Sequence, residues 1–304
     1  MEFGCHLPMF GPIATRENVL TFARRMEALG YASLWVSDHV AIPYVIRSRY
    51  PYRETGEFPW RPDAAWLEAL TALALVAGVT ERVKLGTTIL VLPLRHPVLT
   101  AKMLASLDHL SNGRVILGAG VGWMEEEVTL MGAPFSERGA WSDEAIRIMR
   151  ACWSQERASH TGRFFSFDAI GCFPQPVRKT IPILIGGHTP RAFRRVAELG
   201  DGWHAAFPAV DRLEEGLRLL REECKKIGRR FEDVAITLRA GVALRKDASA
   251  DRQPMTGTPE QIVSDIRRYK ALGVRTLLLE SRQRDLDDMI RIHETIARDI
   301  LPAV

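Results

Sequence analysis

The sequence feature that most constrains the fold is a helix ending that recurs three times and is each time followed by an apolar run. The motif Arg-Arg-x-x-x-Leu-Gly occupies residues 24–30, 194–200 and 267–273. Basic residues suit the last turn of a helix and glycine suits a left-handed cap, so each copy is predicted to end an amphipathic helix. The apolar runs that follow are typical of strands buried on both faces, and such strands form parallel sheets.

Extending this pattern along the chain gives eight strand–helix units. Strands are predicted near 3–7, 33–37, 83–91, 114–119, 182–186, 202–206, 233–241 and 274–279. Helices are predicted near 15–29, 64–78, 97–110, 138–154, 189–199, 211–228, 258–272 and 285–300. Eight such units indicate an α/β fold, a (β/α)₈ TIM barrel; the alternative is a doubly wound open sheet.

The length fits either one domain or two. Dividing 304 residues by roughly 150 per domain suggests two, but α/β barrels of about 250 residues fold as one unit. We therefore expect a single barrel domain over residues 1–304. Two segments exceed the plain repeat: 40–63 after the second strand, and 157–180, a predicted hairpin before the fifth strand. The first insertion is expected on the catalytic face of the barrel.

Charge and cysteine content exclude several classes of protein. The formal net charge is only +4, which is too weak to favour nucleic-acid binding. The four cysteines lack paired spacing, so disulfide frameworks and cysteine-type zinc sites are not expected. The sequence shows no signal peptide and no apolar run long enough to span a membrane. We expect a cytoplasmic homodimer that acts on a small molecule, with no metal site.

In such barrels the reactive groups lie where the strands end at their carboxyl side. Asp38 and His39 follow the second strand and form a candidate proton-handling pair, because a carboxylate can tune a histidine near neutral pH. The alternative is a histidine that only caps local backbone.

Two glycine-containing strand ends are candidate cofactor sites. Gly186, Gly187, His188 and Thr189 run from a strand into a helix start, where backbone N–H groups favour an anion. The alternative there is a tight turn without a ligand. The second strand end, Gly118-Ala-Gly120-Val-Gly122, is bare enough for something flat to approach the backbone, although small residues can also serve barrel packing.

The 40–63 insertion carries four arginines among aromatic residues. These positive charges could hold an anionic tail over the barrel mouth, or could belong to a solvated lid surface. The arginines are Arg47, Arg49, Arg53 and Arg61.

Taken together, these motifs resemble those of the luciferase-like monooxygenase superfamily over nearly the whole chain. The resemblance is carried by Ala28–Tyr31 with Leu34–His39, Arg82–Leu90, Leu107–Arg114, Ile116–Trp123, Pro182–Gly187, Gly200–Trp203 and Gly257–Gln261. Ser-Asp-His after the second strand is similar to the branch that uses the deazaflavin coenzyme F420, whereas flavin-dependent relatives more often have Glu-His-His there.

The resemblance implies roles for particular residues. Asp38 and His39 would face the reactive ring edge, and Thr88-Ile89 would form a non-prolyl cis peptide that bulges behind the ring. Gly186, Gly187, His188 and Thr189 would bind the cofactor phosphate, with Gly120 and Gly122 near the ring. Trp123 and Glu126 stand where some deazaflavin relatives have a Glu and an Asn, so specificity for phosphorylated sugars does not carry over.

Three functions follow from these observations. The first is an F420-dependent oxidoreductase that moves a hydride to or from a small organic substrate, with His39 exchanging the matching proton. The second is an FMN-dependent monooxygenase that works with a flavin reductase. The third is a non-catalytic ligand-binding barrel.

Overall fold

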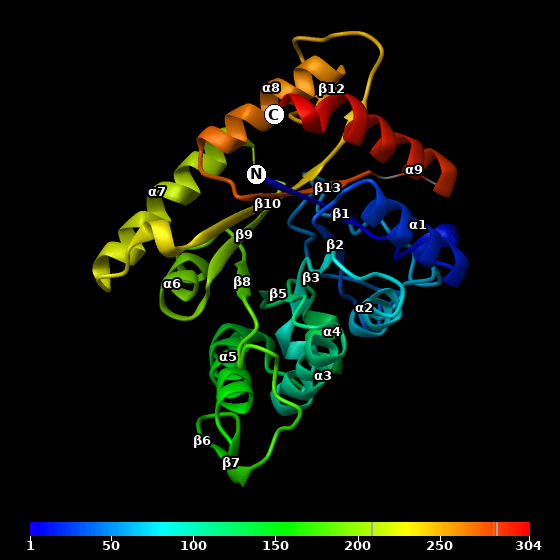
Figure 1. The fold of residues 1–304 in the computed structure, drawn as a ribbon. Coiled ribbons are helices and arrows are strands. Elements are labelled where there is room, and N and C mark those ends of the chain that lie inside the picture. The colour runs from blue at the N-terminus through cyan, green and yellow to red at the C-terminus, as the bar shows by residue number, and fades with distance from the viewer. Residues whose placement is uncertain (208, 282, 284) are drawn as a thin grey trace.

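The molecule is a closed barrel of parallel strands inside a ring of helices (Figure 1). The computed structural model describes residues 1–207, 209–281, 283 and 285–304. The sheet order is β3-β2-β1-β13-β10-β9-β8-β5-β4, and an additional β3–β5 pairing closes the barrel. The strands are β1 (Glu2–His6), β2 (Ser33–Val36), β3 (Lys84–Thr87), β4 (Leu90–Val91), β5 (Val115–Gly120), β8 (Ile183–Gly186), β9 (Gly202–Ala206), β10 (Ala235–Gly241) and β13 (Thr276–Glu280). The predicted TIM barrel is confirmed and the open-sheet alternative is wrong.

One predicted strand is divided into two. The strand expected over 83–91 becomes β3 and β4, which share one position in the wall, and the cis peptide between Thr88 and Ile89 lies between them. Both pieces pair with β5. The barrel therefore has eight wall positions, one of which bulges near its carboxyl end.

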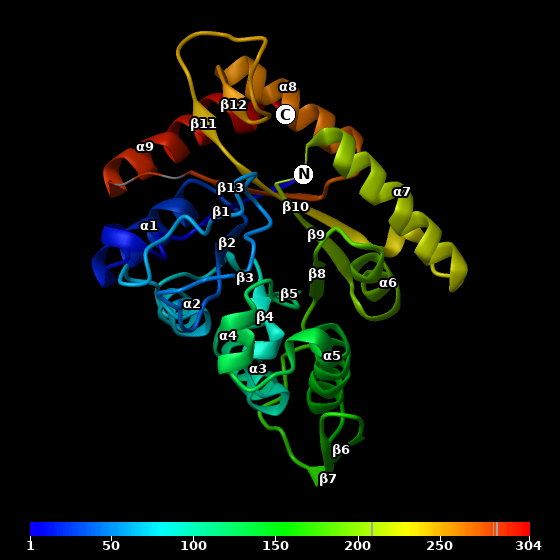
Figure 2. The same cartoon turned by 180° about the vertical axis from the view of Figure 1, so that it is seen from behind.

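The outer ring consists of helices that alternate with the strands, seen from both sides in Figures 1 and 2. They are α1 (Arg16–Ala28), α2 (Ala69–Ala77), α3 (Pro97–Leu110), α4 (Glu125–Leu130), α5 (Arg138–Ser154), α6 (Pro190–Leu199), α7 (Val210–Lys226), α8 (Pro259–Ala271) and α9 (Leu286–Thr295). The predicted helix starts are confirmed at Thr15, Thr189 and Thr258, whose hydroxyls each accept from a backbone N–H in the first turn.

One predicted helix start needs correction, and one helix was missed. The helix expected from residue 64 begins only at Ala69, because the N–H of Leu67 donates to the carbonyl of Met9 and Trp66 pairs with Phe10 in an isolated bridge. Residues 64–68 are thereby drawn toward the segment after β1. The short helix α4 was not predicted from the sequence, and it contributes to the site described below.

The three copies of the glycine motif are not equivalent. Gly30 and Gly273 adopt positive φ angles of 85° and 92°, as expected for left-handed caps. Gly200 instead has a φ of −91°. A Cβ at Gly200 would lie 2.7 Å from Cγ1 of Ile185, so close packing of α6 on β8 explains the missing side chain there.

The interior of the barrel is filled by large side chains that neighbouring glycines admit. A Cβ at Gly86 would lie 2.3 Å from the Trp35 ring, and one at Gly4 would lie 2.6 Å from its Nε1. Trp35 in turn packs with Leu184 and Leu278 across the barrel. The barrel is thus a packed core between two different ends, which are called the mouth (the carboxyl ends of the strands) and the floor (their amino ends).

Two small sheets lie outside the barrel. The predicted hairpin within 157–180 is confirmed as β6 (Ala158–Thr161) and β7 (Ser166–Ile170), and it projects from the ring at the end opposite β11 (Ala243–Leu244) and β12 (Thr256–Gly257) (Figure 2). In the described part of the chain, none of the helices has the length and apolar content needed to cross a bilayer.

Candidate active site

The 40–63 insertion lies over the mouth, as expected from its place after the second strand. It leaves the end of β2 and reaches across to β9, where the ring of Tyr52 lies 6.0 Å from that of Phe207. Two carboxylates of α4 fix its backbone. Glu126 accepts from the N–H groups of Arg47 and Ser48, and Glu127 accepts from those of Val40 and Ala41.

His39 is held by Glu127. Nδ1 of His39 lies 2.7 Å from a carboxylate oxygen of Glu127, and the Glu127 side chain is 3% exposed. The Glu127 carboxylate already accepts hydrogen bonds from two backbone N–H groups and is the acceptor in this contact as well. Nδ1 of His39 therefore carries a proton and donates it. The other ring nitrogen, Nε2, has no hydrogen-bond partner among the described residues and is the position at which His39 can exchange a proton.

Aromatic rings enclose this histidine. The rings of Trp66, Phe58 and Trp123 lie 4.9, 5.1 and 6.2 Å from the His39 ring. Tyr50 and Trp60 of the insertion extend the cluster, and Phe10 joins it from the segment after β1. Apolar surroundings exclude water, which strengthens the Glu127–His39 interaction relative to one in solvent.

Asp38 has different partners from those expected. Its buried carboxylate receives two hydrogen bonds from Arg95, both of 2.7 Å, and a third from the N–H of Val91 in β4. Arg95 is held by ion pairs with Asp38 and Glu68. Burial disfavours its charged form, but these two carboxylates outweigh that effect and raise its pKa. The carboxylate that contacts His39 is therefore Glu127 and not Asp38, a correction to the expected pairing. Asp38 fixes the end of β2 to β4, just beyond the bulge.

The bulge itself explains the bare end of β5. A Cβ at Gly120 would lie 1.6 Å from Cδ1 of Ile89, and a Cβ at Gly118 would lie 2.0 Å from the carbonyl oxygen of Thr87. Gly122 has a φ of 78° and faces Val91. These glycines make room for the bulge, which supports the alternative that they serve barrel packing. Ile89 is half-buried at the mouth and covers them.

Thr88 belongs to a hydrogen-bonded network inside the barrel. Its Oγ1 lies 2.8 Å from Nε2 of His204, whose Nδ1 lies 2.7 Å from Oγ1 of Thr237. Burial, with Arg239 nearby, lowers the pKa of His204 to about 3, so this ring is neutral at physiological pH. Arg239 donates to the carbonyl oxygen of Thr88 and to Glu280.

The turn after β8 has the form expected of an anion site. Gly187 has a φ of +115°, and a Cβ there would lie 3.0 Å from Cβ of Ala192. Thr189 caps α6 with Pro190 at its first position, and Trp203 donates to the carbonyl of Gly187. The backbone N–H groups of Gly187, His188 and Thr189 donate to no described residue, so three donors at a helix start remain open to a ligand.

The four arginines of the insertion differ in their surroundings, although all are exposed. Arg61 forms a two-pronged ion pair with Asp63, and Arg49 donates to the carbonyl of Glu54 within the same segment. Arg47 and Arg53 have no ion pair with any described carboxylate. Arg49 likewise has no ion pair with a described carboxylate, so of the four only Arg61 has its charge neutralised by an acidic side chain.

Several residues of the site could not be selected from the sequence. Glu127 is one of three consecutive glutamates, and its partner His39 lies 88 positions away. Arg239 and Glu280 stand at strand ends but gave no sign that they pair with each other. The pair of His6 with Ser37, 2.7 Å between Nε2 and Oγ, likewise joins two strand ends at the mouth.

Comparison with protein families gives a match over most of the chain. The model of the family described as luciferase-like monooxygenase matches residues 1–256. Among curated relatives, protein Rv0953c of Mycobacterium tuberculosis is 31% identical over 277 residues, which are 90% of this chain and 91% of the relative. An F420-dependent glucose-6-phosphate dehydrogenase of Kribbella flavida is 29% identical over 265 residues, covering 83% of this chain and 73% of the relative.

The descriptions of solved structures with a similar fold name more than one cofactor. A monooxygenase, RslO1, from Streptomyces bottropensis has a TM-score of 0.80 and 23% identity, covering 99% of both chains. An F420-dependent secondary alcohol dehydrogenase has a TM-score of 0.80 and 18% identity, covering 100% of this chain and 98% of its own. A type II Baeyer-Villiger monooxygenase of Pseudomonas putida in complex with FMN has a TM-score of 0.74 and 16% identity, covering 99% and 98%. At these identities the likeness speaks for the fold alone.

Proposed function

Because this chain belongs to the luciferase-like monooxygenase family, we propose that it is an oxidoreductase that transfers a hydride between a deazaflavin of the F420 type and a small organic substrate. The observation that carries this proposal is the His39–Glu127 pair under the insertion at the barrel mouth. A hydride transfer needs a matched proton transfer, and this pair offers one defined nitrogen for it in a site from which aromatic rings exclude water.

The residues present fit such a cofactor. The three N–H donors at Gly187, His188 and Thr189 that have no partner among the described residues would hold its phosphate, and Gly186 would allow the approach. Ile89 would support the ring from behind, with Thr88 beside it and Gly120 and Gly122 accommodating the bulge. When bound, the deazaflavin supplies two-electron hydride chemistry.

The protein's own groups then have separate tasks. Glu127 fixes the His39 ring by holding Nδ1, which leaves Nε2 to give or take the proton. Asp38 acts at one remove, since it holds the backbone of β4 and the Arg95 side chain rather than a reacting group. The 40–63 insertion covers the mouth and orients the substrate.

A second candidate is an FMN-dependent monooxygenase that works with a flavin reductase. It is favoured by the fold neighbours described as monooxygenases, one of them in complex with FMN. Both cofactors carry a phosphate and would use the same turn after β8. The choice of the deazaflavin is supported by the dehydrogenase from Kribbella flavida, which aligns with 83% of this chain.

A titration with both cofactors tests the proposal. Seven tryptophans are present, and Trp66 and Trp123 flank His39, so bound cofactor should quench intrinsic fluorescence. We expect saturable quenching by the deazaflavin at concentrations where FMN has no effect. Tight binding of FMN with none of the deazaflavin would establish the second candidate. Cofactor binding that survives His39→Ala, with no redox activity toward any tested alcohol, aldehyde or enone in the parent protein, would favour a binding protein.

A further inference from the structure

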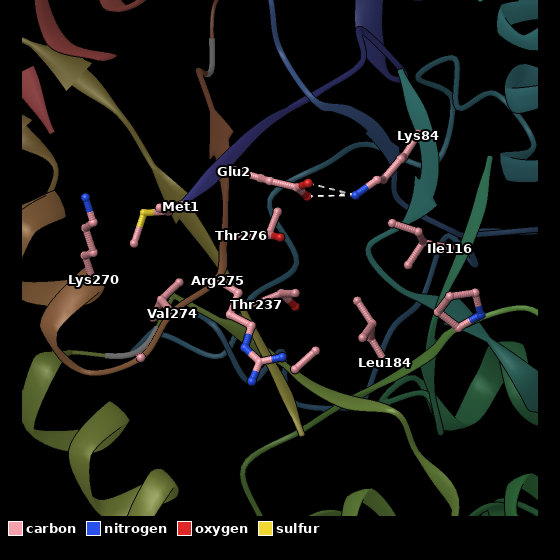
Figure 3. Close-up of a pocket in the computed structure, with 13 residues that line it drawn as sticks. Met1, Glu2, Lys84, Ile116, Leu184, Thr237, Lys270, Val274, Arg275 and Thr276 are labelled. Atoms are coloured by element: carbon pink, nitrogen blue, oxygen red, sulfur yellow. Dashed lines mark hydrogen bonds and ion pairs between the residues drawn. The ribbon is translucent and has the colours of Figure 1, made fainter. Parts of the chain in front are cut away.

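The floor of the barrel holds a cavity at the end opposite the candidate active site. Its volume is about 750 Å³, which is within the range of sites for small organic ligands. It is lined by the amino ends of the strands and by the turn between α8 and β13 (Figure 3). Among the residues described above for the mouth and its hydrogen-bonded network, only Thr237, the partner of His204, also lines this cavity.

One side of this cavity is apolar. Ile116, Leu184 and Ala235 come from β5, β8 and β10 and belong to the cluster around Trp35 inside the barrel. Ile116 and Leu184 lie together on one side in Figure 3. Ile116 and Ala235 remain partly exposed, so this wall is apolar surface that a ligand could remove from water.

The other side carries positive charge that the protein does not neutralise. Lys84 is paired with Glu2, with both carboxylate oxygens 2.9 Å from Nζ. Lys270 of α8 lies on the side of the cavity opposite Ile116, and Arg275, just before β13, lies between Lys270 and Leu184; both are away from the Glu2–Lys84 pair (Figure 3). Within the described part of the chain neither forms an ion pair with a carboxylate, and the guanidinium of Arg275 donates only to the backbone carbonyl of Glu232.

We propose that the floor cavity is a binding site for an amphipathic anion, with its anionic head at Lys270 and Arg275 and its apolar body against Ile116, Leu184 and Ala235. The apolar lining suits the hydrocarbon part of such a ligand, and the two cationic side chains suit its anionic head. A small inorganic anion would leave the apolar surface of the cavity exposed to water, and a neutral apolar molecule would leave the two cations without an anionic partner. The site is separate from the cofactor site and does not depend on the proposed function.

Calorimetric titration of the whole protein with octanoate tests this proposal, with acetate and octanol as the two half-ligands. We expect one saturable site for octanoate, and affinities at least tenfold lower for acetate and for octanol. Raising the salt concentration should weaken the binding of octanoate, because the head contacts are exposed charges. Equal affinities for octanoate and octanol, or no saturable binding of octanoate, would overturn the proposal.

Variants locate the site. Lys270→Glu with Arg275→Glu changes only exposed side chains and should weaken octanoate binding about tenfold or more, whereas Lys246→Glu, an exposed lysine of the β11–β12 loop, should leave it unchanged. Ala235→Leu fills the apolar side of the cavity and should weaken the binding of octanoate. The midpoint temperature of thermal unfolding of the ligand-free variant should stay close to that of the parent protein. Undiminished binding in the double charge variant would place octanoate elsewhere and refute the floor site.

Discussion

The mouth and the floor of this barrel differ in how they treat charge. At the mouth, buried ionisable groups meet partners within the protein: His39 with Glu127, Asp38 with Arg95, and Arg239 with Glu280. At the floor, Lys270 and Arg275 have no acidic partner among the described residues, and they line a cavity that apolar side chains also line. Internal pairing holds groups in fixed positions, as a reacting centre requires, while unpaired charge at an open rim attracts a partner from solution.

The strongest way to break this comparison is to remove the proton-exchanging group of the mouth. His39→Ala should lower turnover by roughly 10²–10⁴-fold, the usual range for loss of general acid–base catalysis. Steady-state assays and a cofactor titration check this, and cofactor affinity should change little. If the variant keeps full activity, His39 is only a cap on local backbone.

A second test concerns the link between the two ends, where His204 lies. Its pKa is about 3 in the folded protein against 6.5 for the free side chain, so unfolding takes up a proton between these values. This histidine's contribution to the free energy of unfolding is complete above pH 6.5 and is lost as the pH falls toward 3. From pH 7 to 5 the loss is about 2 kcal/mol. Urea unfolding at several pH values measures it, and buried His293 should contribute similarly.

His204→Gln is the matched variant for that measurement. It removes the titrating group while keeping a polar side chain between Thr88 and Thr237, so the dependence of unfolding on pH should become shallower. A slope identical to that of the parent protein would show that His204 does not titrate on unfolding in this range.

The third test asks whether Glu127 orients His39 or merely supports the backbone. Glu127→Gln should lower turnover roughly tenfold to a hundredfold, the effect of losing about 1.5–3 kcal/mol from a hydrogen bond to a charged group. A positioning role also requires a shifted pH–rate profile, with Glu127→Asp recovering part of the rate. An unchanged profile with a lower melting temperature would reduce Glu127 to a structural clamp on Val40 and Ala41.

The fourth test sharpens the assignment of the anion turn. Gly187→Ala forces a side chain into a φ of +115° and within 3.0 Å of Ala192. Strain of about 1–3 kcal/mol should weaken deazaflavin and FMN alike by roughly tenfold. Gly228→Ala is the control, since Gly228 also has a positive φ but lies at the end of α7 with open space around it. Equal effects of the two variants on cofactor affinity would remove the turn from the site.

The smallest expected effect concerns the rim of the mouth. Arg47→Gln with Arg53→Gln should weaken the deazaflavin, which carries an acidic tail, and should leave FMN unchanged. Each exposed contact contributes about 0.2–1 kcal/mol, so the two together should cost a few-fold to about tenfold, with a shallower salt dependence. Arg61→Gln is the control because Asp63 already neutralises that side chain. Equal losses for both cofactors would leave the insertion as a cover only.

What could be predicted from the sequence was local in origin. Thr15, Thr189 and Thr258 cap the helices that they were expected to start, because a cap depends on residues three positions apart. Alternation of apolar runs with helices likewise indicated the eight positions of the barrel wall. The cis peptide at Thr88–Ile89 is as the family resemblance implied, though no propensity would have indicated it.

What could not be predicted depends on contacts between distant segments. Nothing local distinguishes Glu127 from Glu125 or Glu126; only the packing of α4 against the insertion aims one of them at His39. Asp38 stands beside His39 in sequence, but neighbouring residues of an extended segment point to opposite sides, and Asp38 turns toward Arg95. The sequence shows that Gly120 has no side chain but not what occupies the space beside it; the Ile89 side chain that does so comes from the bulge between β3 and β4.

The chain of hydrogen bonds from Thr88 to Thr237 has a fixed direction. The Thr237 hydroxyl donates to the carbonyl of Trp203, so its oxygen accepts from the ring of His204 and the proton of that neutral ring is on Nδ1. Nε2 is then an acceptor, and the hydroxyl proton of Thr88 must point to it, into the barrel. Thr88 therefore offers only lone pairs to the mouth, and a cofactor or substrate that contacts this oxygen has to bring an N–H or O–H of its own.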